Sequence, residues 1–506
     1  MATPHERLAD SLSLLKSLQD RGIAAIQASQ LTRTHRERLL GAGFIREVMK
    51  GWYIPVRPDE PPGETTAWYA SFWAFVAGYL NARFGTEWIL SAEQSLSLHI
   101  GDWTVPKQLL VRSPRGGNKP IPLLFGTSLF DVRLELPTAD NIEVKDGLRL
   151  FKLPAALVGC APGWFTAHPI EMRAALAMLP DASDVLRRLL AGNHSIVAGR
   201  LAGAFRNIGR SRIADQIVQT MRAGSYTVNE ADPFAEKPGI TFGARETSPY
   251  VNRMRMMWAK MREPIAQLLP TAPGLPQDVE SYLQKVDDIY VTDAYHSLSI
   301  EGYQVSAELI ERVRSGSWNP ERNENDRQNR NALAARGYWQ SFQSVKTSME
   351  KILRGAQPGE VADADYSHWY NELFGPSVGA GILRPADLAG FRNGPVYIRR
   401  SMHVPPNADA VRELVPAFFE LLRNETEPAV RVVLGHFMFV YIHPYFDGNG
   451  RMGRFLMNLM MASGGYPWTV IPVERRHAYM SALESASVDQ DIVPFAQFIA
   501  ELLPGK

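Results

Sequence analysis

The stretch that decides the fold runs from Pro428 to Ala462 and reads "PAVRVVLGHFMFVYI", "HPYFDGNGR" and "MGRFLMNLMMA". Two apolar segments of helical length flank nine residues that hold a histidine, a carboxylate, two glycines and an arginine. Apolar segments of this length are typical of buried helices rather than of strands. We therefore predict two core helices joined by a short polar loop.

This loop has the features of a phosphate-binding site. The second helix begins near Gly450 and directs its free N–H groups and its positive dipole end into the loop. Gly448 and Gly450 allow the backbone to approach a phosphate closely, and Asn449 tolerates unusual backbone angles. Arg451 and Arg454 are three residues apart, so they share one helix face and can bind successive phosphates. The pattern predicts a nucleotide-binding loop.

Two further residues of the loop suggest chemistry. Asp447 offers a hard oxygen ligand to Mg²⁺, which takes one or two carboxylates and completes its shell with phosphate oxygens and water. His443 titrates near neutral pH and suits removal of a proton from a hydroxyl group. Any one of these residues is compatible with a plain tight turn, but a turn does not require the whole ordered set. His436, by contrast, is predicted to be a satisfied core histidine.

The stretch "HPYFDGNGRMGR" closely resembles the signature of the Fic domain and departs from its commonest form only at Tyr445, where phenylalanine is more usual. The resemblance extends to "FRNGPVYIRRSMHVPPNADAVRELV" and spans roughly Tyr250 to the C-terminus. It implies an all-α Fic fold with a β-hairpin flap. Family members bind the target as an extended segment along the flap edge. Here that edge would run from Val396 to Met402 and include Val396, Tyr397 and Ile398.

The activity that the resemblance implies is adenylylation, the transfer of AMP from ATP to a Ser, Thr or Tyr hydroxyl of a target protein. ATP and Mg²⁺ would be required. Matching positions make His443 the general base and Asp447 the metal ligand. They also assign the anion hole to Gly448, Asn449 and Gly450. The distal phosphates would be bound by Arg451 and Arg454.

A second motif of the family lies in "HSLSIEG", where Ser297, Glu301 and Gly302 match an inhibitory pattern found on a helix ahead of the core. A carboxylate bound to an arginine fork competes with the γ-phosphate of ATP for the same donors. We expect Glu301 to pair with Arg454 and to inhibit the resting protein. From the residues alone, the alternative is a helix that ends at an exposed glutamate and a glycine.

The amino-terminal residues have the proportions of a winged helix-turn-helix. Thr34 to Leu40 would be the recognition helix and Glu47 to Ile54 the wing. The candidate DNA-binding residues are Arg33, His35, Arg36, Arg38, Arg46 and Lys50. The alternative is a helical adaptor whose arginines form a solvated face.

Together with "EWILSAEQSLSLHIGDWTVPKQLLVRS", residues from about Leu8 to Leu190 resemble the antitoxin of type IV abortive-infection systems, a winged-helix DNA-binding regulator with an α+β domain behind it. The prediction is a multidomain, mainly α protein. Its parts are a winged helix at 1–58, an α+β domain at 59–225, a linker at 226–249 and a Fic domain at 250–506.

The composition of the chain limits its domain number, its partners and the kinds of site it can contain. With 506 residues, of which 45% are hydrophobic and 21% charged, two or three domains are expected. A net charge of +1 argues against a whole-chain grip on nucleic acid or membrane. The single cysteine, Cys160, excludes an intramolecular disulfide and a cysteine-based zinc cluster, and is predicted to be buried. With no leader-like start and no apolar run of membrane-spanning length, a cytoplasmic protein without membrane contact is predicted.

Alternatives to a forward transferase stay open. A DNA-binding transcriptional regulator could use the Fic module as a nucleotide sensor. A Fic enzyme could also act in reverse, by de-AMPylation, or use another donor, because the loop binds phosphates and not the base. The predicted partners are a target protein, DNA through the amino-terminal region, and a second copy of the chain in a homodimer.

Overall fold

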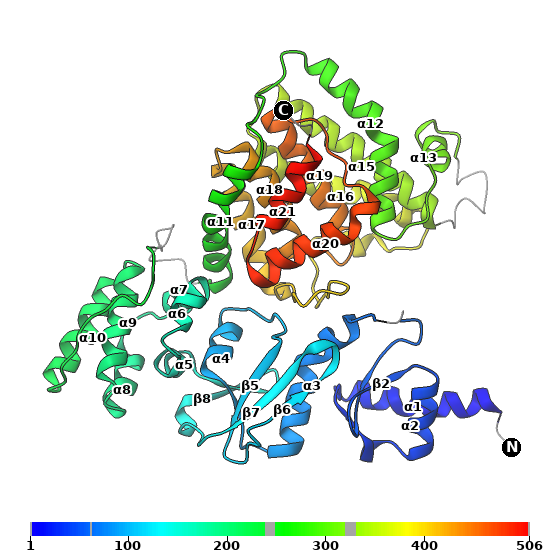
Figure 1. The fold of residues 1–506 in the computed structure, drawn as a ribbon. Helices are drawn as coiled ribbons and strands as arrows, with labels where there is room; N and C mark the ends of the chain where they lie inside the picture. Colours follow the sequence, from blue (N-terminus) through cyan, green and yellow to red (C-terminus); the bar gives the residue numbers. More distant parts are fainter. Residues whose placement is uncertain (1–2, 61–62, 238–247, 319–329, 504–506) are drawn as a thin grey trace. The chain divides into compact units, whose positions relative to one another are not determined.

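The computed structural model describes residues 3–60, 63–237, 248–318 and 330–503 (Figure 1). The chain divides into two compact units. Unit 1 comprises Met1–Arg253 together with Tyr397–Val404, and unit 2 comprises Met254–Val396 and Pro405–Lys506. Part of the predicted linker, residues 238–247, lies outside the described residues.

Unit 1 begins with two helices and a small sheet. The elements are α1 (Pro4–Asp20), β1 (Ile26–Gln27), α2 (Arg33–Gly41), β2 (Ile45–Met49) and β3 (Trp52–Pro55). The strands pair antiparallel in the order β1-β3-β2. Thr32 caps α2 by accepting a hydrogen bond from the His35 N–H, which satisfies one of the free donors of the helix start. The predicted helix and wing thus form as α2 and the β2–β3 hairpin, while the winged-helix assignment stays a prediction.

A mixed layer of one helix and two small sheets follows. Its elements are α3 (Thr66–Phe84), β4 (Ile89–Leu90), β5 (Gln108–Ser113), β6 (Pro120–Pro122), β7 (Ser128–Arg133), β8 (Ile142–Lys145) and β9 (Leu148–Phe151). The sheet order is β4-β5-β7-β6, with β5 and β7 parallel and the outer pairs antiparallel. Strands β8 and β9 form a separate antiparallel hairpin.

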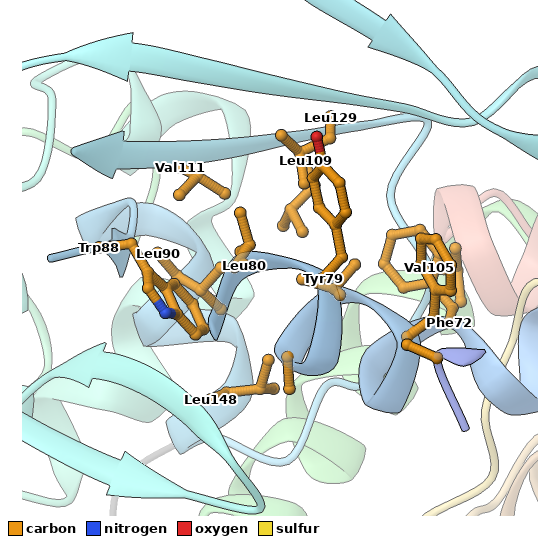
Figure 2. Packing of buried hydrophobic residues seen from close by; sticks show 14 of the residues in the cluster. Phe72, Tyr79, Leu80, Trp88, Leu90, Val105, Leu109, Val111, Leu129 and Leu148 are labelled. Atoms are coloured by element: carbon orange, nitrogen blue, oxygen red, sulfur yellow. The ribbon is translucent and has the colours of Figure 1, made fainter. Parts of the chain in front are cut away.

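Helix α3 forms the centre of this layer. Figure 2 shows Leu80 of α3 between Val111 of the sheet and Leu148 of the hairpin. Aromatic side chains of α3 fill the remaining space, and Trp68 and Phe72 are completely buried. The helix is apolar on nearly every side because it is covered on more than one face.

The remaining helices of unit 1 are short. They are α4 (Ala92–His99), α5 (Leu153–Gly159), α6 (Trp164–Ala167), α7 (Pro169–Ala177), α8 (Ser183–Ala191), α9 (Ser195–Asn207) and α10 (Ser211–Ala223). The combination of strands and helices confirms the α+β character predicted for this part of the chain. Cys160 is buried, as expected, and burial raises the pKa of its thiol, so it is a packing residue rather than a nucleophile.

Unit 2 is helical, and its described residues form no strand. Its helices are α11 (Pro249–Leu268, whose first turn is counted in unit 1), α12 (Val279–Ile300), α13 (Ala307–Arg314), α15 (Arg330–Leu353), α16 (Pro358–Gly379), α17 (Ala408–Asn424), α18 (Pro428–Ile442), α19 (Asn449–Gly464), α20 (Arg476–Glu484) and α21 (Val493–Leu502). The mainly α fold class is confirmed. None of the helices that the structure describes is long and apolar enough to cross a membrane.

The two core helices predicted from the sequence are α18 and α19, and both are buried on nearly every side. They approach closely at Gly453, where a Cβ atom would overlap Val440 and the His436 ring. His436 is completely buried and its Nε2 lies 2.7 Å from the Tyr479 hydroxyl. It is therefore a core histidine, as expected, although only Nε2 is bonded and Nδ1 has no hydrogen-bond partner among the described residues. This tight packing fixes both ends of the loop between the helices.

The predicted β-hairpin flap is not formed. Residues 394–406, called the flap segment below, contain no strand. Ser401 N–H donates to Ile398 O in a turn, and Arg400 has a φ of 61°. Three prolines of the segment lack the N–H that a ladder needs. Two other backbone groups of the segment bond to residues far away in the chain: Arg400 N–H donates to the Thr66 hydroxyl, and Met402 O accepts from Val105 N–H.

Candidate active site

The loop from His443 to Gly448 is shaped by two residues with left-handed backbones. His443 ends α18 with φ 53° and ψ 60°, and Gly448 precedes α19 with φ 84°. At Gly448 a side chain would be strained, and its Cβ would also overlap the Phe374 ring. The glycine therefore lets the chain turn sharply into α19, whose first N–H groups have no intrahelical acceptor.

Asn449 holds this loop closed. Its side-chain oxygen accepts from Tyr445 N–H at 3.0 Å, and its side-chain nitrogen donates to Tyr445 O at 2.8 Å. The Tyr445 ring stacks on Tyr370 with a centroid distance of 3.7 Å. The Asn449 side chain is thus committed to the loop, which leaves only its backbone for an anion. The sequence pattern did not indicate this bracing role.

His443 is set up as a proton acceptor. Its Nδ1 lies 3.1 Å from Val440 O, and because a carbonyl only accepts, Nδ1 carries the proton and Nε2 keeps its lone pair. Burial lowers the pKa of His443 to about 4, against the opposing effect of the hydrogen bond to Val440. The ring is therefore neutral at physiological pH.

Arg392, which was not predicted from the sequence, stabilises the backbone of the loop. It is 1% exposed, and its Nε donates to His443 O at 2.7 Å. Other guanidinium nitrogens donate to Gly394 O and Pro406 O, at the two ends of the flap segment. Arg392 therefore ties the backbone of the histidine to the base of the flap segment.

Asp447 lies at the mouth of the loop with its side chain 60% exposed. Its Oδ1 accepts from Gly448 N–H at 2.6 Å and lies 3.4 Å from Arg451 Nη2. The other carboxylate oxygen makes no hydrogen bond to the described residues. One carboxylate with an open oxygen suits a metal that is completed by phosphate and water.

Arg451 is held between aromatic rings. Its guanidinium carbon lies 5.2 Å from the Tyr303 centroid and 5.0 Å from the Phe374 centroid. Its side chain is buried and its Nε has no hydrogen-bond partner among the described residues. A buried, unbonded guanidinium nitrogen is costly, so this group fits an anionic ligand.

Arg454 is the more deeply engaged of the two arginines. Its side chain is 4% exposed, and Nε donates to the Ser297 hydroxyl at 2.8 Å. Nη2 donates to Ser297 O at 3.0 Å and to Glu301 Oε1 at 2.7 Å. The structure thus brings Ser297, Glu301 and Arg454 together as the sequence motif implies.

Glu301 places its carboxylate over the first turn of α19. It caps α12 at its C-terminus, and Gly302 with φ 88° reverses the chain. A Cβ atom on Gly450 would overlap Glu301 Oε1. Burial alone raises the pKa of Glu301, but Arg454 and Arg451 outweigh it and hold that pKa below its usual value. A carboxylate therefore occupies the position where a helix start and two arginines would bind a phosphate.

The open edge predicted for the flap is short. The N–H groups of Val396, Tyr397 and Ile398 make no hydrogen bond to the described residues, and the Tyr397 side chain is exposed. This part of the segment keeps the donors that an extended peptide could use.

The predicted DNA-binding residues divide into two groups. Arg38 donates to Arg7 O and to the Ser11 hydroxyl, and Arg46 donates to Glu64 O and pairs with Glu60. His35 lies 2.9 Å from the Ser11 hydroxyl, and Arg36 donates to Ala28 O. These four side chains therefore stabilise unit 1 itself. Arg33, paired with Glu37, and Lys50 in the β2–β3 turn are exposed.

A cavity of about 460 Å³ in unit 1 contains none of the predicted site residues. It is lined by α9 and the segment from Thr227 to Pro233, and Arg200 is its charged residue. Its lining residues include the hydroxyl-bearing Ser195 and Thr227 but no carboxylate, histidine or cysteine.

In a comparison with known proteins, the family model described as the Fic/DOC family matches residues 365–461. The proteins named Protein adenylyltransferase Fic of Drosophila willistoni and Drosophila yakuba are each 37% identical to this chain over 125 residues. The match covers 24% of this chain and about a quarter of each relative. Among solved structures, Fic-1 (residues 134–508) from C. elegans aligns over 66% of this chain and 94% of its own, with 20% identity and a TM-score of 0.36.

Proposed function

We propose, from the premise that this chain carries a Fic domain, that it transfers AMP from ATP to a hydroxyl group of a target protein. The observation that carries the proposal is the convergence in one loop of a neutral histidine, a helix N-terminus and two buried arginines. The first supplies a base, and the others supply donors for a triphosphate.

The reaction assigns a role to each group. The target hydroxyl oxygen attacks the α-phosphorus of ATP, and its proton passes to His443 Nε2. A new oxygen–phosphorus bond forms while the bond from the α-phosphorus to the bridging oxygen breaks, and pyrophosphate leaves. The first turn of α19, with Gly448 and Gly450, receives phosphate oxygens, and Arg451 and Arg454 bind the distal phosphates.

Mg²⁺ would be held by Asp447 together with phosphate oxygens and water. When bound, it neutralises charge that builds up on the phosphates. The exposed carboxylate with one open oxygen fits that ion. Among the residues that the structure describes, no group of three or more acidic, histidine or cysteine side chains is arranged to hold a metal ion by itself.

The same site supports autoinhibition by Glu301. Its carboxylate lies 2.7 Å from Arg454 Nη2 and covers the first turn of α19. A γ-phosphate would need the same donors, so the two anions compete. Ser297 holds the arginine in this position through its hydroxyl and its carbonyl.

The test uses the full chain with Glu301→Gly and ATP labelled at the α-phosphate. The expected result is label covalently attached to protein, and none when His443→Ala is added. Label from the γ-phosphate should not be retained. Changed DNA affinity without attached label would instead support the nucleotide sensor, and removal of AMP from pre-labelled protein would support the reverse reaction.

DNA binding by unit 1 stays a prediction, and the predicted residues whose side chains are exposed are Arg33, which pairs with Glu37, and Lys50. Self-association into a homodimer also stays a prediction. Neither is needed for the transfer chemistry.

A further inference from the structure

The flap segment is built into unit 1 by its second half. Met402 and Val404 pack against the apolar cluster that surrounds α3. Met402 O accepts a hydrogen bond from Val105 N–H at 3.2 Å. Residues 397–404 are accordingly part of unit 1, although the chain enters and leaves them from unit 2.

A buried carboxylate, Glu64, faces this segment at the start of α3. Its side chain is 3% exposed. Its Oε1 accepts from Thr65 N–H at 3.2 Å and from the Thr66 hydroxyl at 2.6 Å. Glu64 therefore caps α3 with one oxygen and keeps the other for a different partner.

The second carboxylate oxygen of Glu64, Oε2, faces two arginines of the flap segment. Oε2 lies 3.2 Å from Arg399 Nε and 3.7 Å from Arg400 Nε, as ion pairs rather than as aligned hydrogen bonds. A buried carboxylate is costly without a nearby cation, and these two arginines provide it. Thr66 adds a directed contact, because its hydroxyl accepts from Arg400 N–H at 3.2 Å.

The contacts divide the segment into a held half and an open half. Arg400 and Met402 use their backbone groups on unit 1, and the turn at Arg400 separates them from the residues before it. Val396 and Tyr397, before the turn, have N–H groups that bond to none of the residues the structure describes. The held half therefore follows directly on the open half along the chain.

We propose that unit 1, through Glu64 and Thr66, holds the flap segment so that its edge at residues 396–398 is presented to an extended segment of the protein substrate. Glu64 is a positioning residue in this scheme, since it acts through Arg399 and Arg400 and touches neither ATP nor the transferred group. The inference rests on the proposed function for its substrate, but the holding contact can be measured without any activity.

The first measurement is the rate at which trypsin cleaves after Arg399 and Arg400 in the folded full chain, with the cut located by mass spectrometry. Glu64→Gln keeps an oxygen for the α3 cap and removes the charge that faces both arginines. Cleavage there should become about three- to tenfold faster, because proteolysis follows the population of the opened segment and these guanidinium groups are partly exposed. Glu60→Gln, which removes a carboxylate paired with Arg46 in the same connection, is the matched control and should leave the rate unchanged.

A second variant guards against misfolding as the cause. Thr66→Val keeps the shape of the side chain and removes the acceptor of Arg400 N–H, so it should also speed cleavage after Arg399 and Arg400. Cleavage elsewhere in the chain should not change in either variant. Equal rates after Arg399 and Arg400 in wild type, Glu64→Gln and Thr66→Val would overturn the proposal.

The second measurement concerns positioning and uses Glu301→Gly as the active background. Adding Glu64→Gln should lower the initial rate of label transfer to lysate proteins while leaving ATP affinity unchanged. Faster cleavage with an unchanged rate of transfer would overturn the positioning role and leave only a structural contact. If Glu301→Gly itself transfers no AMP, the proposed function fails and the positioning role fails with it, while the cleavage rates still decide whether Glu64 holds the segment.

Discussion

Removing the Glu301 carboxylate should activate the protein, and the structure sets the scale of the effect. Arg454 is almost fully buried, and of the hydrogen bonds that its guanidinium donates to Ser297 and Glu301, only the one to Glu301, at 2.7 Å, has a charged acceptor. A charge-assisted bond of this kind contributes about 1.5–3 kcal/mol. A γ-phosphate must displace it, and each 1.4 kcal/mol is about a factor of ten. Glu301→Gly should therefore raise productive ATP use about ten- to a hundredfold.

The assay is the initial rate of label transfer from α-labelled ATP at one subsaturating ATP concentration. Glu301→Gln keeps a neutral hydrogen bond and loses the charge, so its rate should fall between those of wild type and Glu301→Gly. Glu311→Gln breaks an exposed pair with Arg314 on α13 and serves as the control, with no change expected. A well-folded Glu301→Gly protein that transfers no faster than wild type would refute the competition between carboxylate and phosphate.

Four further outcomes are expected. His443→Ala should bind ATP as wild type does but transfer no label, and an equal loss of ATP binding would make the residue structural. Since burial lowers the pKa of His443 to about 4, the base is present above that value; the transfer rate of Glu301→Gly should be level between about pH 6 and 8 and fall as the pH approaches 4, whereas an inflection near pH 6.5 would contradict the burial. Asn449→Ala leaves Tyr445 N–H and O without partners and should lower the free energy of unfolding in urea by about 2 kcal/mol or more. If unit 1 binds DNA, Arg33→Ala with Lys50→Ala should weaken binding and flatten its dependence on salt in a titration of the full chain, and an unchanged slope would remove these residues from the interface.

The local arrangement of the loop could be predicted from the sequence because its residues are contiguous, whereas its chemistry stays a prediction. A histidine at a helix end, glycines at a turn and arginines three apart on a helix are patterns with local causes. The partner of Arg454 could be expected only through the family resemblance, since Ser297 and Glu301 lie 157 and 153 positions away. Arg392 could not be predicted, because it donates to backbone carbonyl groups. Every residue type has such a group, so the sequence does not indicate which residue accepts.

The structure differs from the sequence-based predictions where side chains or backbone groups bond to distant residues. The flap hairpin was expected from the family resemblance, but Arg400 N–H and Met402 O bond to Thr66 and Val105 rather than within a hairpin, and no local pattern signals partners hundreds of positions away. Arg38 and Arg46 read as a basic surface, although their side chains bind carbonyl, hydroxyl and carboxylate groups within unit 1. Charge can be read from composition, whereas the direction of a side chain depends on packing.

The membership of Tyr397–Val404 in unit 1 has a practical consequence for dividing the chain. The polypeptide passes between the units at three places, after Arg253, after Val396 and after Val404. A cut in the predicted linker would therefore give an amino-terminal fragment without Met402 and Val404 on its apolar cluster and without the cations that face Glu64. The complementary fragment would carry those apolar side chains uncovered. Low solubility of either piece would reflect this interlocked chain path, so binding and activity are best measured on the intact polypeptide.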